Sequence, residues 1–197
     1  MKNLNSLTDD MLVALYSKGD DKAFDELLSR YQSKLFNYIF FIVRNQELTE
    51  DIFQETFVKA IMTIQQGRYA PDGRFGAWLT RIAHNLVIDS FRQDRNENTV
   101  SNDDSEIDLF NNADLCDDNV EMQMVNEQTL DDVRRLLNAL PDNQREVVYM
   151  RFYQDLSFKE IAEITGVSIN TALGRMRYAL LNMRRLAQEK DIVLQMY

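Results

Sequence analysis

Apolar residues recur every three to four positions through most of this 197-residue chain, and the polar-apolar alternation typical of strands is absent. This periodicity predicts an all-α fold, with four helices in the amino-terminal part. Thr8 can cap a short helix that ends before Gly19, and a longer helix should cover about 21–44. Thr49 is expected to cap the third helix, and the fourth should begin at Phe75.

The third predicted helix has an apolar stripe on the side expected to face inward. Its members are Ile52, Phe53, Phe57, Ala60 and Ile64. A loop over residues 66–74, rich in Gly and Pro, should separate this helix from the fourth. The loop carries Arg68 and Arg74, so two basic side chains precede the fourth helix.

A second helical pattern begins near Thr129. One amphipathic helix is expected over about 130–140, where Pro141 stops it, and another over about 143–152. A short helix, a glycine turn and a longer helix should follow. This succession predicts a helix-turn-helix.

Local signals support each part of the predicted helix-turn-helix. Ser157 and Glu160 can form a capping box on the short helix, Gly166 suits the tight turn, and Ser168 can cap the longer helix. The shared core of the two helices should consist of Ile161, Ala162, Ile164, Val167, Ala172, Met176, Ala179 and Met183.

Negative charge is concentrated in the middle of the chain. The net charge is −10, yet residues 96–133 hold twelve acidic residues and no Lys or Arg, whereas the remainder has 22 basic and 20 acidic residues. One charge sign with few aromatic residues disfavours a packed core. We therefore expect two small helical domains, 8–95 and 129–190, joined by an acidic linker over 96–128.

Composition disfavours several classes of protein. The single cysteine, Cys116, cannot form an internal disulfide, and the amino end lacks the pattern of a secretion signal, which together favour the cytoplasm. The apolar run over residues 39–43 is too short to span a bilayer. One histidine, no glycine-rich phosphate loop and no cluster of metal ligands disfavour an enzyme and predict no metal or cofactor.

The longer helix of the helix-turn-helix has the composition of a DNA-reading element. It carries four arginines between positions 175 and 185, and no acidic residue lies between Glu163 and Glu189. The first residues of such a helix enter the major groove, where Arg can read guanine and Asn adenine, while later ones contact phosphates. The predicted DNA-binding residues are Ser168, Asn170, Thr171, Gly174, Arg175, Arg177, Tyr178, Arg184 and Arg185.

Segments of both domains resemble a known family. Residues 48–60 and 75–93 closely resemble the second conserved region of bacterial RNA polymerase sigma factors, and residues 140–168 resemble the fourth. Two regions in this order with a short linker look like the extracytoplasmic-function group of the sigma-70 family. The resemblance implies a protein that binds core RNA polymerase and directs promoter-specific initiation without catalytic residues of its own.

The same resemblance implies partners and roles for residues. Expected partners are core RNA polymerase, through its flap and the coiled coil of its largest subunit, promoter DNA and an anti-sigma factor, with no small-molecule substrate and no direct membrane insertion. In the D-x-x-Q-E pattern, the coiled coil would be contacted by Asp51, Gln54, Glu55 and Phe57. The −10 element would be melted and held by Arg68, Tyr69, Arg74, Arg81, Asn85 and Arg92, whereas the helix-turn-helix would read the −35 element.

Three further points concern single residues and the linker. Trp78 could stack on a base or belong to the core, and His84 is expected to be an ordinary surface residue facing outward. Where the family usually has more basic residues, this chain has Leu173, Tyr178 and Leu180, which suggests fewer phosphate contacts. The acidic linker is hypothesised to imitate RNA within a basic channel of the polymerase.

Two other classes of function stay open at this point. A conventional DNA-binding regulator would use the amino-terminal helices for dimerisation or sensing and would bind duplex DNA alone. A helical interaction protein with no role on DNA would tolerate the loss of Arg175 and Arg177.

Overall fold

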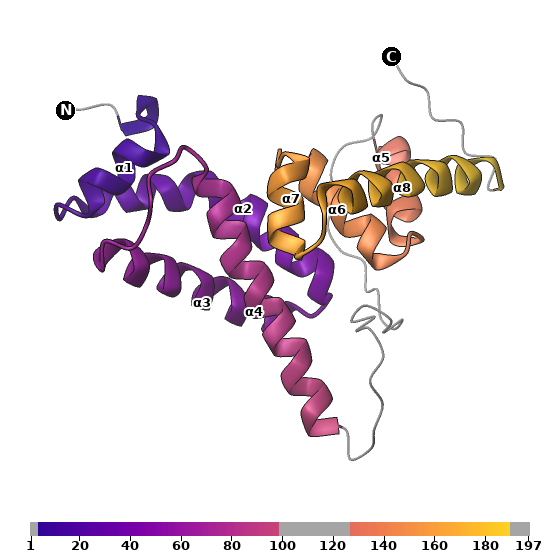
Figure 1. Ribbon diagram of the computed structural model, residues 1–197, viewed down its shortest axis with the longest axis horizontal. Helices are drawn as coiled ribbons and strands as arrows, with labels where there is room; N and C mark the ends of the chain where they lie inside the picture. The colour runs from indigo at the N-terminus through magenta and orange to yellow at the C-terminus, as the bar shows by residue number, and fades with distance from the viewer. Residues whose placement is uncertain (1–3, 99–126, 190–197) are drawn as a thin grey trace. The chain divides into compact units, whose positions relative to one another are not determined.

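The computed structural model describes residues 4–98 and 127–189, and the side chains within 4–93 and 133–189. Regular structure in these residues is helical throughout (Figure 1), and the chain divides into two compact units, whose described residues are 4–98 and 127–189. The predicted all-α fold with two small domains is therefore confirmed.

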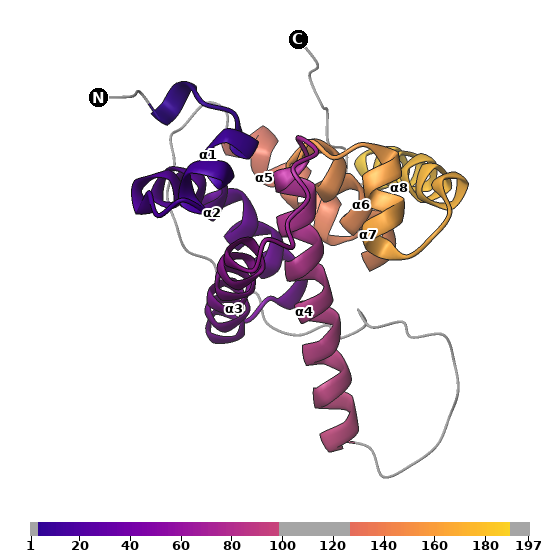
Figure 2. The same cartoon turned by 60° about the vertical axis from the view of Figure 1, so that its left-hand side comes forward.

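The amino-terminal unit consists of a 3-10 turn and four α-helices. After the turn Leu4–Ser6 come α1 (Asp9–Tyr16), α2 (Asp21–Val43), α3 (Gln46–Gln65) and α4 (Phe75–Asn98). Helix α2 packs against each of the other three, and α3 also packs along α4 (Figures 1 and 2). The largest fully buried side chains of this unit are Leu12, Leu27, Leu35, Tyr38, Ile39, Phe75, Leu79 and Val87.

The starts of α1 and α3 show how well local sequence signals predict helix caps. Thr8 caps α1 as predicted, since its hydroxyl accepts a hydrogen bond from the Met11 amide at 3.4 Å. The predicted cap at Thr49 is wrong: α3 begins at Gln46, and Asn45 is the cap, with its side chain accepting from the Leu48 amide at 3.0 Å. Thr49 is fully buried inside the helix, where its hydroxyl donates to the Asn45 carbonyl.

His84 does not face outward as the sequence suggested. It is 7% exposed, and its Nδ1 lies 3.1 Å from the Tyr38 hydroxyl in the interior of the unit. Helix α4 packs against both α2 and α3, so its buried arc is wider than the single stripe of a helix with one neighbour. The polar ends of His84 and Tyr38 meet within this wider core, which satisfies both groups.

The carboxyl-terminal unit consists of α5 (Glu127–Asn138), α6 (Asp142–Phe152), α7 (Phe158–Thr165) and α8 (Ile169–Glu189). Helix α8 packs against the other three. Arg145, buried near the start of α6, pairs with Asp142 and donates to the Asn138 carbonyl at 3.3 Å, which ties α6 to the end of α5.

The helix-turn-helix forms as its sequence predicts. Ser157 and Glu160 complete a capping box, in which Glu160 accepts from the Ser157 amide at 2.8 Å. Gly166 adopts a left-handed conformation with φ 69°, a region that residues with a side chain rarely occupy. Ser168 accepts a hydrogen bond from the Thr171 amide at 3.0 Å at the start of α8.

The inward face of α8 departs from the prediction at one end. Ala172, Met176 and Ala179 are buried as expected, but Met183 is only half-buried and Ala187 is buried instead. A step of four residues turns an α-helix by about 400°, so Ala187 continues the face after Met183. The core contact of α8 therefore extends one turn further than predicted.

The helices also shorten the expected linker. Residues 96–98 belong to α4 and residues 127–128 to α5. The rest of the acidic segment, including Cys116 and the hypothesis of RNA mimicry, lies outside the described residues, as does the carboxyl-terminal tail.

We expect Ser157→Ala to lower the free energy of unfolding of the carboxyl-terminal unit by about 1 kcal/mol, because the first turn of α7 loses its cap. Glu160→Gln is the matched control, since an amide oxygen can still accept from the Ser157 amide. Urea unfolding followed by circular dichroism measures both. Equal stability of Ser157→Ala and the unaltered protein would contradict the role of the capping box.

Candidate functional sites

The outward side of α3 brings together three of the four residues predicted to contact the polymerase. Asp51, Gln54 and Glu55 are all exposed. Glu55 forms an ion pair with Lys59 at 3.0 Å, with both side chains about half exposed, so water screens this pair and it adds little to stability. The face is therefore acidic and open to a basic partner.

Phe57 does not belong to this outward face. It is 6% exposed, and its ring packs against Phe53 and Phe24 at centroid distances of 5.0 and 6.1 Å. Six residues turn an α-helix by about 600°, which leaves Phe57 roughly 120° away from Asp51. Its place is in the core of the unit, where burial leaves it little surface for direct contact with a partner.

Two apolar residues on the outward face were missed. Val58 and Met62 are 53% and 51% exposed, and they follow Asp51 by seven and eleven residues. These spacings place them within about 20° of Asp51 around the helix. The signal in the sequence was their position outside the inward stripe of α3, where apolar residues have no core to join.

A groove of about 450 Å³ lies between α3 and α4. Asp51, Glu55 and Lys59 line one side, and Asp89 and Arg92 line the other. The groove thus joins residues predicted for polymerase contact to one predicted for −10 DNA contact.

The loop 66–74 is held against α1 and the start of α4. The Tyr69 hydroxyl donates to one oxygen of Asp10 at 3.0 Å, and the Gly73 amide donates to the other at 2.8 Å. The Tyr69 ring packs edge-on against Trp78 at 4.8 Å and Phe75 at 5.8 Å. Burial, and then the Asp10 carboxylate, raise the pKa of Tyr69 well above its usual value, so the hydroxyl stays a donor at physiological pH.

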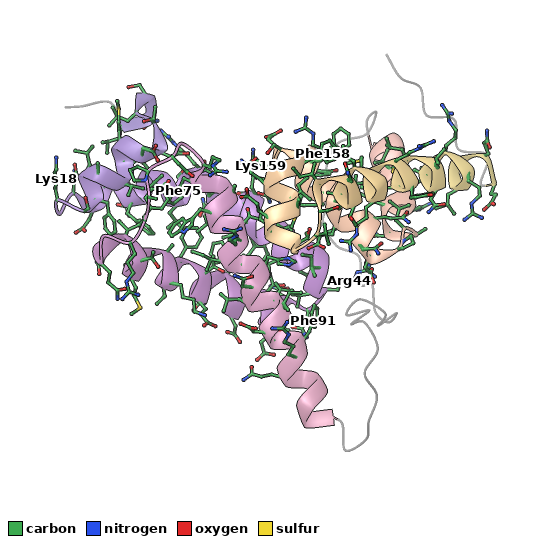
Figure 3. All side chains as sticks on the ribbon, in the orientation of Figure 1. Lys18, Arg44, Phe75, Phe91, Phe158 and Lys159 are labelled. Carbon is green, nitrogen blue, oxygen red and sulfur yellow. The ribbon has the colours of Figure 1, made fainter. Side chains whose placement is uncertain are left out.

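Trp78 fits neither of its two interpretations alone. It is half-buried, with its ring against Tyr69 and Phe75, while Phe75 itself is almost fully buried and points into the unit (Figure 3). Trp78 therefore belongs to the edge of the core and also keeps part of its surface exposed beside the loop.

The predicted −10 residues form a basic loop and one stripe along α4. Arg68 and Arg74 are exposed on the loop, and Arg74 binds Asp72 through two nitrogens at 3.0 and 2.7 Å, which lowers the pKa of Asp72. The exposed residues of the stripe are Arg81, Asn85 and Arg92. Their spacing confines them to an arc of about 40°, so one strand could follow all three.

The outward surface of α8 carries most of the residues predicted for −35 DNA. Asn170, Thr171 and Arg177 are exposed near its start, and Tyr178 is 62% exposed. At the far end Arg185 makes an exposed ion pair with Glu189 at 3.3 Å, and the adjacent Arg184 is also exposed. The start of α8 thus offers amide and guanidinium groups, as base reading requires.

An apolar stripe accompanies the arginines of α8. Ile169, Leu173 and Leu180 are 47%, 43% and 51% exposed, and their spacing places them within an arc of about 40°. Leu181 is 50% exposed further around the helix. Within residues 127–189, the part of this unit that the structure describes, these side chains stay about half exposed.

Gly174 lies on the outward side of α8 in ordinary helical conformation. A Cβ atom placed there would meet no atom within 4 Å. Packing inside the unit therefore does not require glycine at this position, whereas close approach of another molecule would.

The described residues hold neither a cluster of metal-ligating side chains nor a membrane-spanning helix. No group of three or more His, Cys, Asp or Glu side chains there is arranged to hold a metal ion. Within the same residues, no helix has both the length and the apolar character needed to cross a bilayer.

Comparison with known families gives two matches, one in each unit. Residues 27–97 match the model of Sigma-70 region 2, and residues 130–180 match that of Sigma-70, region 4. The first covers α3, the loop and all but the last residue of α4, and the second covers α7, the turn and α8 as far as residue 180.

Curated relatives match across both units. The chain is 35% identical over 156 residues to the ECF RNA polymerase sigma factor BldN of Streptomyces coelicolor, with 79% of this chain and 56% of BldN covered. It is 31% identical over 175 residues to the ECF RNA polymerase sigma-E factor of Haemophilus influenzae, with 86% and 90% covered. SigW of Bacillus subtilis, also an ECF RNA polymerase sigma factor, is 28% identical over 165 residues, with 81% and 86% covered.

Solved structures share the fold. CnrH, in complex with the cytosolic domain of CnrY, aligns with a TM-score of 0.61 at 24% identity, covering 92% of this chain and 97% of CnrH. The sigma factor RpoE of Bartonella quintana, in complex with the anti-sigma factor NepR, aligns with a TM-score of 0.65 at 21% identity, covering 85% and 98%.

We expect Gly174→Ala to have opposite effects on stability and on DNA binding. Alanine removes the cost of glycine inside a helix, so the free energy of unfolding should rise by up to about 1 kcal/mol. Binding to promoter DNA should weaken, because the added methyl group stands where the duplex would approach. Urea unfolding and electrophoretic mobility shift measure the two effects, with Gln188→Ala on the same helix as control. Unchanged DNA affinity in a stabilised Gly174→Ala variant would show that the glycine has no role at the duplex.

Proposed function

The chain belongs to the sigma-70 family of RNA polymerase sigma factors, which direct core RNA polymerase to promoters, and we propose how its two units divide that work. The amino-terminal unit binds the polymerase and melts and holds the −10 element, and the helix-turn-helix reads the −35 element. The observation that carries this proposal is that α3, α4 and α8 each expose a separate face of fitting chemistry.

Polymerase contact is assigned to the outward face of α3. Asp51, Gln54 and Glu55 complement a basic surface such as the coiled coil that the family uses, while Val58 and Met62 supply apolar area. Exposed charge pairs contribute only about 0–1 kcal/mol each, so the apolar pair should account for much of the affinity. Phe57 supports this face from the core.

Melting and capture of the −10 element are assigned to the loop and the α4 stripe. Arg68 and Arg74 can bind phosphates, and Tyr69 and Trp78, both half-buried, pack against each other at the same loop. Arg81, Asn85 and Arg92 extend this surface along α4. Unstacked bases bind such mixed surfaces through stacking and backbone charge, which offsets the few kcal/mol that unpairing costs.

The −35 element is assigned to the start of α8. Asn170 and Arg177 are the candidates for base edges, whereas Arg184 and Arg185 should position the helix on phosphates. Apolar Leu173 and Leu180 lie among them, so few charges contact the duplex. We infer that the isolated protein binds duplex DNA weakly.

The remaining assignments follow from this role. The polymerase performs the chemistry, so the chain has no catalytic residue, cofactor or small-molecule substrate of its own. Because the polymerase works in the cytoplasm, the protein is placed there. RpoE occurs in complex with the anti-sigma factor NepR, and CnrH with the cytosolic domain of CnrY, which supports an anti-sigma factor as a further partner. The flap of the polymerase is the expected partner of the carboxyl-terminal unit.

A conventional regulator, the alternative that the sequence left open, does not fit the family to which the chain belongs. It also has a helix-turn-helix, but it gives no role to the exposed acidic and apolar face of α3. Duplex binding by the protein alone, without new transcripts, would favour it.

The promoter-directing role is tested with core polymerase and fragmented genomic DNA from the same cells, by mapping RNA 5′ ends. We expect discrete starts that need the protein and share two upstream elements at fixed spacing. Arg177→Ala should weaken these starts, and the effect should concentrate on promoters that depend most on the upstream element. No new starts with active core polymerase would contradict the proposal.

We expect Met62→Ser to weaken binding to core polymerase by about tenfold, because an exposed apolar side chain that becomes buried on binding is replaced by a polar one. Met11→Ser is the matched control, since Met11 is 55% exposed on α1 but does not lie on the α3 face. Fluorescence anisotropy of labelled protein measures both affinities. Equal affinities for the two variants would remove Met62 from the interface.

A further inference from the structure

Asp10 makes two hydrogen bonds that span the loop 66–74. Its carboxylate accepts from the Tyr69 hydroxyl, 59 residues away in the sequence, and from the Gly73 amide, 63 residues away. The first bond holds the side chain of one loop residue, and the second fixes the backbone four residues later. A single carboxylate thus binds both ends of the segment 69–73.

The first turn of α1, which carries Asp10, is held on α2 by hydrogen bonds. The neighbouring residue, Asp9, accepts from Arg30 at 2.9 Å and from the Tyr31 hydroxyl, both on α2. Arg30 also donates to the Leu7 carbonyl at 2.9 Å and binds Glu26 at 2.9 Å on its own helix. These bonds fix the first turn of α1 on α2, so Asp10 is a fixed acceptor rather than a mobile surface group.

The backbone at Gly73 shows why the loop needs such an acceptor. Gly73 has φ +75°, a left-handed conformation, and it immediately precedes the turn into α4 at Phe75. The amide that Asp10 holds therefore lies where the chain changes direction. Its position sets where Arg74, the next residue, lies before α4 begins.

Electrostatics alone would disfavour an acid at this place. A half-buried carboxylate beside a loop that binds an anionic strand repels that strand. Because the charge of Asp10 lowers affinity for the strand, any benefit of this residue must come from the way it positions the loop.

We propose that Asp10 is a positioning residue for promoter melting, which holds the loop 66–74 in the shape that receives the −10 strand. Asp10 does not touch the DNA and acts through Tyr69 and Gly73. The inference rests on the proposed function of the loop and adds to it a residue of α1 that no resemblance assigns.

The charge and geometry of Asp10 predict opposite outcomes for Asp10→Asn. Loss of a negative charge by itself strengthens binding of an anionic strand. In Asp10→Asn one carboxylate oxygen becomes an amide nitrogen, which faces a donor and cannot accept its hydrogen bond. Loss of this acceptor releases the loop and weakens strand capture. Asp25→Asn removes the same charge from an exposed site on α2 and is the matched control.

The experiment uses holoenzyme on a promoter identified by the transcript mapping, with permanganate reactivity of −10 thymines as the measure of melting. We expect Asp10→Asn to lower open-complex formation by about tenfold, the effect of losing a hydrogen bond to a charged group, while Asp25→Asn leaves it unchanged or raises it. Tyr69→Phe keeps the ring and loses the donor, so it should lower open-complex formation less than Asp10→Asn does. The double variant should be less impaired than the two single effects combined. Melting by Asp10→Asn equal to that of Asp25→Asn overturns the proposal.

A second measurement needs no DNA. Hydrogen exchange of the Gly73 amide in the free protein should become about tenfold faster in Asp10→Asn and stay unchanged in Asp25→Asn. Unchanged exchange overturns the proposed hold on the loop. Faster exchange with normal melting overturns the role in melting. If the unaltered protein melts no promoter, the assigned function of the loop fails, and exchange still decides whether Asp10 fixes it.

Discussion

The aromatic contact around Phe75 is the constraint on which the amino-terminal unit depends. Phe75 begins α4, and its ring meets Tyr31 of α2 at 5.3 Å and Tyr69 of the loop at 5.8 Å. Gly76 makes the approach of α4 to α2 possible, since a Cβ atom there would lie 2.8 Å from the Tyr31 ring. Tyr31 is in turn held by Asp9. This contact fixes where α4 begins, and packing against α2 and α3 then sets the direction of the helix and of its basic stripe.

The same contact couples stability to function. Phe75 is almost fully buried at the start of α4. Its ring packs on α2 through Tyr31 and also contacts Tyr69 of the loop, so it supports both the helix packing and the conformation of the loop. Under the proposed role of the loop, substitutions that loosen Phe75 would therefore alter strand capture and the free energy of unfolding together. The hydrogen bonds of Asp10 lie at the edge of this cluster, where the loop can be changed while the core stays intact.

The sequence was informative where structure is local. Caps at Thr8, Ser157 and Ser168 and the turn at Gly166 involve residues within a few positions of one another, and each forms as predicted. Helix periodicity also gave the all-α fold and the inward residues of most helices.

Apart from the cap wrongly assigned to Thr49 in place of Asn45, the failures share one physical cause, which is the number and position of neighbouring helices. His84 is buried because α4 has two neighbours, and a projection of one helix cannot show the second. Phe57 was assigned to a partner by family pattern although its place on α3 faces the core, and Val58 and Met62 were overlooked on the side that stays exposed. The link from Asp10 to Tyr69 spans 59 residues, beyond the reach of any local pattern.

The exposed surfaces explain why such a protein acts through a larger assembly. Each face is small, with a few charges, and water and salt weaken exposed charge pairs. When one unit is bound to the polymerase, the other reaches its DNA element at a high effective concentration, because both belong to one chain. Weak individual contacts then combine into strong and selective binding only where both elements and the polymerase are present together. Modest surfaces in two separate units are therefore a source of specificity, since a more basic α8 would bind duplex DNA without regard to the −10 element.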